Sequence, residues 1–351
     1  MTMRPVMRPV MRAVLPILDG LPHRHVTERI TPNLVQLAGS GGFAPTGGRA
    51  VMTSATYPNH ATLVTGTDPG QHGITANFVV RDGAIVAAES VGPRTPTLFD
   101  LDVETAAVFG DQNLVGVTAA RHATTHWPPD GVVPDDAVRT SDGYIDDETT
   151  AEQVIAALGS DAQIVVAQLN NPDTAGHAFG PDTDEAADAY RATDRRLADI
   201  GSALRPCWAE TLVVIVSDHD QVTVTDPACV DLWSPIRARD LQLTVIPEGE
   251  AAVITGDDPT DARWLDEVDG VAGNQEWYDG ARLAWTDPGR AFGWGEVTLR
   301  GIHGGPQSRT QVAVVTGGHP IAARIAADIT KTPPAATAWA RWLAAAVGQR
   351  L

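Results

Sequence analysis

The sequence predicts an α/β protein with a mostly parallel central sheet, helices on both faces, and a small inserted α+β cap subdomain. Two observations predict the core: short apolar runs alternate with helical segments, and acidic or histidine side chains follow several of the runs. Uninterrupted apolar runs are typical of parallel strands buried on both faces. A third observation predicts the insertion, because five of the nine tryptophans gather between residues 226 and 300.

The composition describes a globular protein that is not expected to bind polyanions. Its 351 residues carry 25 Lys and Arg against 44 Asp and Glu, and the net charge of −19 disfavours a nucleic acid polymer or an anionic membrane as partner. No run of 18 apolar residues exists, so a membrane span is not expected. Two cysteines are too few for a disulfide framework, although the two could form a single disulfide bond with each other. We expect a cytoplasmic protein.

The core elements follow one another in an order typical of a parallel sheet. The basic segment 1–12 resembles a signal peptide, but the apolar run after it is short and is interrupted by Pro16, so we expect a frayed tail. The alternation of strands and helices holds over 13–225 and returns over 301–351, which predicts one core split by the insertion 226–300. Expected strands of the core are 13–18, 105–109, 163–169, 211–216 and 311–316, with a hairpin at 78–91 and helices at 31–38, 97–101, 149–158, 185–204 and 337–347. The insertion contains strand-like runs at 243–246 and 251–254.

The segment 52–77 places a hydroxyl group at a predicted helix start. Thr56 stands where an apolar run ends, and Pro58 suits the first turn because its missing N–H is not needed there. Free backbone N–H groups and the helix dipole make such an end a natural phosphate site. The plainer alternative is that Thr56 is an N-cap residue, and this stretch alone leaves both open.

Acidic and histidine side chains lie close to the ends of the predicted strands. In an open α/β sheet, residues beyond the carboxyl ends of the strands converge on one crevice. Three carboxylates and three imidazoles there have the ligand chemistry of two divalent metal ions, with zinc as the first expectation. One such aspartate is more often a cap, but capping explains the whole set poorly. The set comprises Asp19, Asp173, His177, Asp218, His219 and His303.

Several short motifs span most of the chain in a fixed order. They are Leu18-Asp19-Gly20, Thr56-Tyr57-Pro58-Asn59-His60, Leu63-Val64-Thr65-Gly66, His72-Gly73-Ile74, Asn77, Asp173-Thr174-Ala175-Gly176-His177, Phe179-Gly180-Pro181, Ser217-Asp218-His219 and His303-Gly304-Gly305. Together they resemble the alkaline phosphatase superfamily, and most closely its nucleotide pyrophosphatase/phosphodiesterase branch. The resemblance implies an alkaline phosphatase-like catalytic core over 13–225 and 301–351.

The resemblance also implies a site with two divalent metal ions, Zn²⁺ first and Mn²⁺ as the alternative. Asn77 matches an asparagine that donates to a phosphoryl oxygen. One ion would be held by Asp173, His177 and His303, and the other by Asp19, Thr56, Asp218 and His219.

The activity implied by the resemblance is hydrolysis of phosphodiester or pyrophosphate bonds through a phosphothreonine on Thr56. Coordination to a dication makes a threonine hydroxyl a far better nucleophile. The substrate would be a small phosphate ester, with a nucleotide as one option. No substrate-clamping arginine is recognised beside Thr56, which favours diesters. A phosphomonoesterase or phosphonate hydrolase on the same fold is the alternative, and a catalytically silent metal-binding protein is the alternative of another class.

A few positions depart from the family pattern or allow two roles. Asp220 replaces the usual glycine, and we expect a solvated turn residue rather than a partner for a ligand histidine. The segment from Leu21 to Arg24 replaces the familiar aromatic–arginine pair. Tyr57 either stacks on an aromatic leaving group or packs in the core. Loop residues without a direct role in chemistry are expected at Asn59, His60, His72, His122 and His126. For His122 and His126, which stand close together in the sequence, a metal site is the less favoured alternative to a surface loop.

Overall fold

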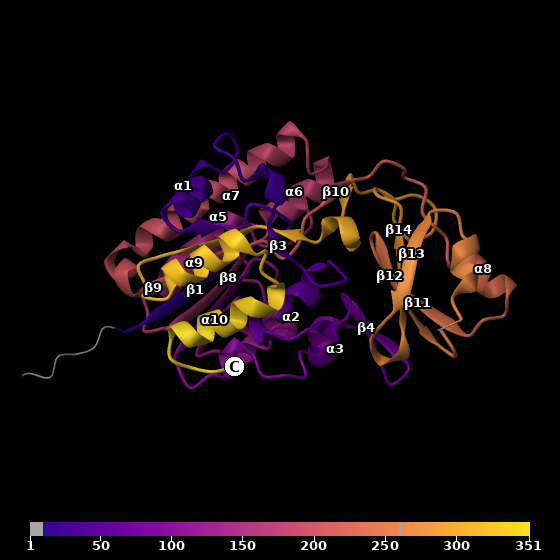
Figure 1. Ribbon diagram of the computed structural model, residues 1–351, viewed down its shortest axis with the longest axis horizontal. Coiled ribbons are helices and arrows are strands. Elements are labelled where there is room, and N and C mark those ends of the chain that lie inside the picture. Colours follow the sequence, from indigo (N-terminus) through magenta and orange to yellow (C-terminus); the bar gives the residue numbers. More distant parts are fainter. Residues whose placement is uncertain (1–9, 260) are drawn as a thin grey trace, which may run out of the picture.

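The computed structural model describes residues 10–259 and 261–351, so most of the expected tail at 1–12 lies outside the described residues. Its centre is a seven-stranded sheet in the order β2-β17-β9-β1-β8-β6-β7 (Figure 1). Strands β9, β1, β8, β6 and β7 are parallel, whereas β17 and β2 pair antiparallel. The predicted fold class is confirmed. The strands are β1 (Arg12–Leu18), β2 (Gly42–Phe43), β6 (Thr105–Phe109), β7 (Thr125–Trp127), β8 (Ile164–Leu169), β9 (Thr211–Val216) and β17 (Ala313–Thr316).

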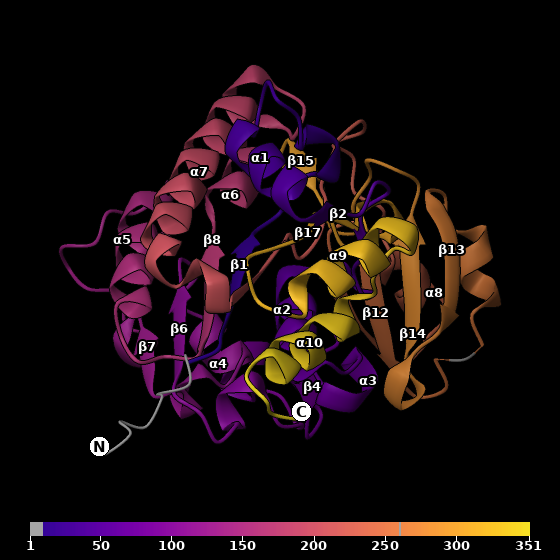
Figure 2. The same cartoon turned by 60° about the vertical axis from the view of Figure 1, so that its left-hand side comes forward.

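Helices cover both faces of this sheet, because successive side chains of a strand point to opposite sides. Leu15 and Ile17 of β1 pack with one set of helices, and Val14 and Leu18 with the other. Figure 2 shows the two layers. The first set is α2 (Thr56–Thr65), α4 (Leu114–Val117), α9 (Ala322–Lys331) and α10 (Trp339–Ala346), and the second is α1 (Pro32–Ser40), α5 (Asp147–Leu158), α6 (Asn171–Phe179) and α7 (Asp184–Ala203).

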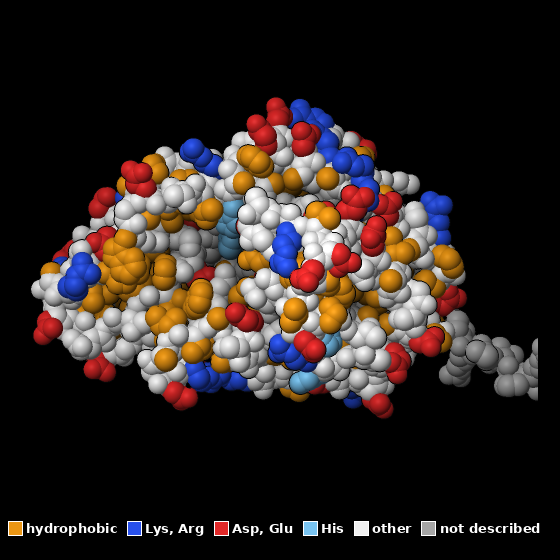
Figure 3. All heavy atoms as spheres, turned by 180° about the vertical axis from the view of Figure 1, so that it is seen from behind, with side chains coloured by type: hydrophobic (Ala, Val, Ile, Leu, Met, Phe, Trp, Pro, Cys, Tyr) orange, Lys and Arg blue, Asp and Glu red, His pale blue; other side chains and the backbone are white. Residues whose placement is uncertain are grey.

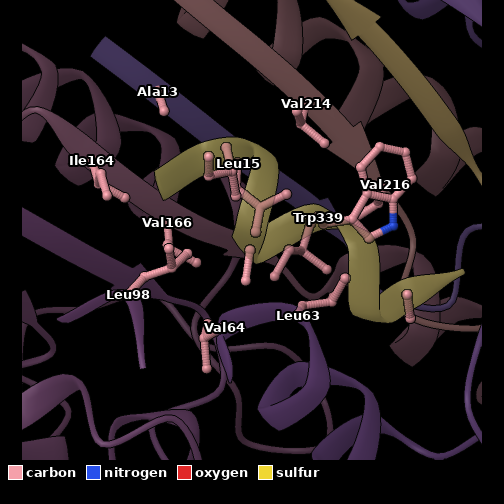
Figure 4. Close-up of a cluster of buried hydrophobic side chains, with 14 of the residues drawn as sticks. Ala13, Leu15, Leu63, Val64, Leu98, Ile164, Val166, Val214, Val216 and Trp339 are labelled. Carbon is pink, nitrogen blue, oxygen red and sulfur yellow. The ribbon is translucent and has the colours of Figure 1, made fainter. Parts of the chain in front are cut away.

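Trp339 holds α2, the helix that begins at Thr56, against the sheet. Its indole is fully buried in one cluster with Leu63 of α2 and with Val214 and Val216 of β9 (Figure 4). Truncating a buried aromatic side chain of this size to alanine costs about 3–5 kcal/mol. The start of α2 is therefore firmly placed relative to the strand ends.

The insertion forms its own antiparallel sheet, in the order β11-β12-β14-β13, which lies beside the large sheet (Figure 1). The sequence indicated β11 (Leu243–Glu248) and β12 (Ala251–Gly256). It gave no signal for β13 (Val271–Glu276), whose side chains are exposed or half-buried and do not alternate, nor for β14 (Arg282–Thr286). A short helix, α8 (Trp233–Ala238), completes this region, whose limits at 226 and 300 remain a prediction.

Short pairs of strands connect the larger elements. The predicted hairpin turns at Asp82-Gly83, between β4 and β5. The segment around His126, expected to be a loop, is instead edge strand β7 of the large sheet. No helix of the described residues is long and apolar enough to cross a membrane. The remaining short elements are α3 (Pro69–His72), β3 (Gly48–Arg49), β4 (Phe78–Arg81), β5 (Ala84–Ala87), β10 (Val222–Thr223), β15 (Gly301–Ile302) and β16 (Thr310–Gln311).

Asp147, at the start of α5, ties α6 and α7 together. Its Oδ1 accepts from the backbone N–H of Asn171 at 3.0 Å, and its Oδ2 accepts from the hydroxyl of Thr193 at 2.5 Å. Thr193 lies among the apolar residues of α7, and this hydrogen bond gives its buried hydroxyl a partner. Burial raises the pKa of Asp147 to about 6.

The Asp147→Asn variant is expected to be more stable than the wild type at neutral pH. Because the folded-state pKa is raised, the wild type loses stability as pH rises through about 4 to 6, and the variant does not. The expected difference is about 1–3 kcal/mol near pH 8, and it should vanish near pH 4. Urea unfolding at several pH values measures it. A difference that does not change with pH would contradict the prediction.

Candidate active site

Three neighbouring strands deliver aspartates to one edge of the sheet. Asp19 follows β1, Asp218 follows β9, and Asp173 lies on α6 just after β8, and these strands are adjacent in the order β9-β1-β8. Gly20 lets the backbone that follows β1 lie close to Asp173. Its φ is +59°, and a Cβ at this position would lie 2.6 Å from Asp173 Oδ1. The backbone N–H of Gly20 donates to Asp218 Oδ1 at 3.0 Å.

Histidines reach the same edge by two different routes. The segment after β8 was not predicted as a helix, but α6 places His177 one turn after Asp173, with Nε2 3.3 Å from Asp173 Oδ2. His303 precedes β17 rather than following it. Because β17 is antiparallel to β9, it begins at the edge where the parallel strands end, and His303 stacks on His219 with ring centroids 3.9 Å apart.

The expected ligand residues form two groups that share one histidine. Asp19, Asp218 and His219 offer ligand atoms that all lie within 4.8 Å of one another, and so do Asp173, His219 and His303. The resemblance assigned His177 rather than His219 to the second group. His177 lies beside that group, against Asp173.

Each of the three histidines is oriented by a backbone carbonyl. The Nδ1–H of His177 donates to Gly301 O at 2.8 Å, that of His219 to Asp220 O at 3.1 Å, and that of His303 to Ser54 O at 3.1 Å. A carbonyl can only accept, so in each neutral ring the lone pair lies on Nε2, which faces Asp173 Oδ2 in His177 and the Thr56 hydroxyl in His219. Metal-ligating histidines typically use this arrangement, with the second nitrogen bonded to an outer partner.

The carboxylates of the site also fit divalent cations. Asp19 Oδ1 and Asp218 Oδ2 are buried and have no hydrogen-bond partner among the described residues. Burial and the neighbouring carboxylates of Asp218 and Asp173 raise the pKa of Asp19. Burial and His219 lower the pKa of His303. A bound dication would offset the repulsion between the carboxylates and use the free oxygens, so the residues present fit such an ion.

Thr56 and Asn77 stand at the edge of these groups. The N-cap of α2 is Ala55, so Thr56 is the first helical residue rather than the cap, and its hydroxyl lies 3.3 Å from His219 Nε2. The backbone N–H of Tyr57 donates to Asn77 Oδ1 at 3.0 Å. Since that N–H can only donate, the Nδ2 amide of Asn77 remains available as a donor.

A cavity of about 330 Å³ opens onto the site. From behind, a hollow between the cap and the core exposes a histidine side chain (Figure 3). The lining carries one carboxylate outside the ligand set, Asp142, and neither lysine nor arginine among the described residues. It comprises Thr56, Asn77, Ser141, Asp142, Tyr144, Asp173, Thr174, His177, Ala178, Leu299 and His303.

The structure shows which of two possible roles the side chains of Asp220 and Tyr57 have. Asp220 is 7% exposed and pairs with Arg24, whose Nη1 lies 2.5 Å from Asp220 Oδ1, so the expected solvated turn residue was wrong. No local pattern indicated this pair, whose members lie 196 residues apart in the sequence. Tyr57 is buried in the core, and its hydroxyl accepts from Asn113 Nδ2, which favours packing over stacking on a substrate.

Asn59 and His72 shape their loops, and two glutamines contact the site without having been predicted from the sequence. Asn59 bonds to the backbone of Val51, Thr53 and Ala55, and His72 bonds to Thr62 and Ile74. His60 lies closer to the site than expected, with Nδ1 3.4 Å from Asp218 Oδ2. The glutamines contact ligand aspartates, Gln168 at Asp19 Oδ2 and Gln221 at Asp173 Oδ1. His122 pairs with Asp100, away from His126.

The fold and this cluster of side chains define an alkaline phosphatase-like protein. Residues 13–269 match the family described as type I phosphodiesterase / nucleotide pyrophosphatase. The chain belongs to that family, the nucleotide pyrophosphatase/phosphodiesterase branch of the alkaline phosphatase superfamily. His303 lies beyond the matched residues, and the structure brings it together with Asp173 and His219, as the resemblance implied for Asp173.

Similar proteins and structures agree with this family. An uncharacterised pyrophosphatase/phosphodiesterase of Schizosaccharomyces pombe is 29% identical over 222 residues, 60% of this chain and 44% of that one. Venom phosphodiesterase of Macrovipera lebetinus is 27% identical over 205 residues, 55% of this chain and 23% of that one. The chain therefore spans less than half the length of either relative.

Two solved structures share the fold. An inactive threonine-to-alanine variant of murine ectonucleotide pyrophosphatase/phosphodiesterase 5 in complex with AMP has a TM-score of 0.74 at 16% identity, covering 97% of this chain and 95% of that one. Phosphonoacetate hydrolase of Sinorhizobium meliloti, in complex with phosphonoformate, has a TM-score of 0.68 at 17% identity, covering 88% and 90%.

Proposed function

We propose that this protein is a dimetal hydrolase that cleaves phosphodiester or pyrophosphate bonds through a phosphothreonine on Thr56. The observation that carries the proposal is the hydroxyl of Thr56 at the start of a buried helix, 3.3 Å from His219 Nε2. A binding protein has no need of a nucleophile there. The inactive murine variant that lacks a threonine supports the same role.

Two divalent cations, Zn²⁺ first and Mn²⁺ as the alternative, would supply positive charge that favours the alkoxide and stabilises the leaving oxygen. Asp173, His177 and His303 would hold one, and Asp19, Asp218, His219 and Thr56 the other, with His219 near both groups. Thr56 Oγ1 attacks phosphorus, and the bond to the leaving alkoxide or phosphate breaks. The Nδ2 amide of Asn77 donates to a non-bridging oxygen. Water then cleaves the Oγ1–P bond and restores the hydroxyl.

The proposed substrate is a small phosphate ester with one negative charge on the reacting phosphate, such as a nucleotide ester. The cavity lining offers no lysine or arginine to the second charge of a monoester, and Tyr144 offers an aromatic surface. The AMP bound to the murine structure supports a nucleotide. We also propose a cytoplasmic location, which signal cleavage of the mature protein would contradict.

The substrate class is tested with the zinc-loaded protein on bis-p-nitrophenyl phosphate and p-nitrophenyl phosphate. We expect kcat/KM for the diester to exceed that for the monoester by about tenfold or more, since one uncompensated charge is worth at least about 1.4 kcal/mol here. A preference for the monoester would favour a phosphomonoesterase. Cleavage of phosphonoacetate alone would favour a phosphonate hydrolase, the activity named for the Sinorhizobium neighbour.

A further inference from the structure

A turn of the cap sheet lies between the two loops that carry Asn77 and His303. This turn, Glu248-Gly249-Glu250, joins β11 to β12. The backbone N–H of Glu250 donates to His303 O at 2.9 Å. A Cβ at Gly304 would lie only 1.7 Å from Glu248 O, so the two backbones meet with no room for a side chain.

Glu248 directs its carboxyl group at the backbone of Asn77. Its Oε1 accepts from the N–H of Asn77 at 2.9 Å, and the N–H of Phe78 also donates to this carboxyl. Glu248 is 6% exposed, and no ion pair among the described residues includes it. Burying a carboxyl group without a cationic partner is unfavourable unless hydrogen bonds use it. Here the hydrogen bonds to Glu248 hold the backbone amides of Asn77 and Phe78, two successive residues of one loop.

The side chain of Asn77 is fixed at its other end by the nucleophile's helix. Its Oδ1 accepts from Tyr57 N–H, one residue after Thr56, which leaves Nδ2 as a donor at the cavity. The cap therefore holds the backbone of Asn77, and α2 holds the side-chain amide of the same residue. The face of the cap sheet around Ile246 and Val253 packs against Met52 and Ala76, so both attachments belong to one rigid contact.

We propose that Glu248 is a positioning residue, through which the cap sets the distance between the Asn77 amide and the phosphoryl group that Thr56 attacks. The inference rests on the proposed function of Asn77. It makes the cap part of the active-site support rather than a cover over it. A donor that stabilises developing charge acts only when it is held in place, and a displacement of about 1 Å can cost about 100-fold in rate.

Glu250 provides a matched control on the same turn. Its Oε1 accepts from Gly289 N at 3.3 Å and its Oε2 from Ser308 Oγ at 3.4 Å, and neither contact involves the Asn77 loop. Replacing Glu250 tests the stability of the turn without removing the contact to Asn77.

The test is a double-mutant cycle between Glu248 and Asn77 in the zinc-loaded protein. Glu248→Met keeps the length of the side chain but removes the acceptor, and we expect kcat on bis-p-nitrophenyl phosphate to fall about 10- to 100-fold with little change in KM. Glu248→Gln keeps an acceptor oxygen and should retain most activity. In the Asn77→Ala background, Glu248→Met should have little further effect, whereas Glu250→Gln should have the same effect in both backgrounds.

Two further measurements do not depend on turnover. Exchange of the amide hydrogens of Asn77 and Phe78 should accelerate in Glu248→Met and not in Glu248→Gln. Orthovanadate affinity should fall in Glu248→Met only where Asn77 is present. Unchanged kcat in Glu248→Met, or losses that simply multiply with those of Asn77→Ala, would overturn the inference. If the wild type cleaves no ester, the proposed function fails, and the cycle measured by orthovanadate binding decides the role of Glu248.

Discussion

Replacing Thr56 with alanine is expected to lower kcat/KM for phosphodiesters by about 10⁴-fold or more, because removing a nucleophile abolishes the covalent route. The substitution removes the hydroxyl and the γ-methyl group of Thr56 and leaves the other side chains of the site in place. Metal binding, which Asp19, Asp218 and His219 can support without it, should be largely retained. Steady-state kinetics and metal analysis of the purified variant measure both quantities.

Two further substitutions separate the loss of a nucleophile from damage to α2. Thr65 lies in the same helix. Its hydroxyl donates to Ala61 O and accepts from the backbone N–H and the hydroxyl of Thr67, none of which is a residue of the site, so Thr65→Ala should keep the activity of the wild type. Thr56→Ser restores a hydroxyl and should recover measurable turnover. Acid quenching should trap a phosphoryl adduct on the peptide that contains Thr56. Undiminished hydrolysis in Thr56→Ala would remove this residue from the mechanism.

Removing divalent cations is expected to abolish activity and to destabilise the fold. A ligand at about 100 times its Kd stabilises the native state by about 2.7 kcal/mol, which corresponds to a decrease in Tm of about 4 °C for each ion removed by chelation. The reason lies in the crowded carboxylates, since Asp218 and Asp173 both raise the pKa of Asp19. Differential scanning calorimetry with chelator and with added Zn²⁺ or Mn²⁺ measures the effect.

The Asp19→Asn variant and the wild type are expected to exchange their order of stability when metal ions are added. In chelator it should be more stable than the wild type by about 1–2 kcal/mol, because a buried, repelled charge has been removed. Adding metal ions should stabilise the Asp19→Asn variant only slightly, so the wild type should then be the more stable protein. Asp161→Asn, at an exposed position, is the control and should behave as the wild type does. A gain from metal as large as that of the wild type would show that Asp19 is not a ligand.

Much of the fold could be predicted because the buried parallel strands are uninterrupted apolar runs. Such runs located β1, β8 and β9 within a residue of their observed bounds. The same runs located Asp19 and Asp218, since the polar residues that end a strand mark its carboxyl edge. Asn59 and His72 were also correctly expected to shape their loops.

The features that could not be predicted depend on contacts between residues far apart in the sequence, which no local sequence pattern contains. Helix α6 has a proline and a glycine within nine residues, and tertiary packing rather than propensity stabilises it. Arg24 and Asp220 are each ordinary turn residues until the fold brings them together. The buried Glu248 stands at the end of a strand of the insertion, where an exposed carboxylate would have been the simpler expectation.

The span of the site along the chain has a consequence for the order of folding. Its residues run from Asp19 to His303. We expect β17, which begins ten residues after His303, to pair with β9 before that imidazole is held beside the others. During synthesis, Asp19 and Thr56 leave the ribosome long before the strand that completes the site. The nascent chain therefore cannot bring the proposed metal ligands together until β17 has been made, and metal loading should follow folding rather than guide it.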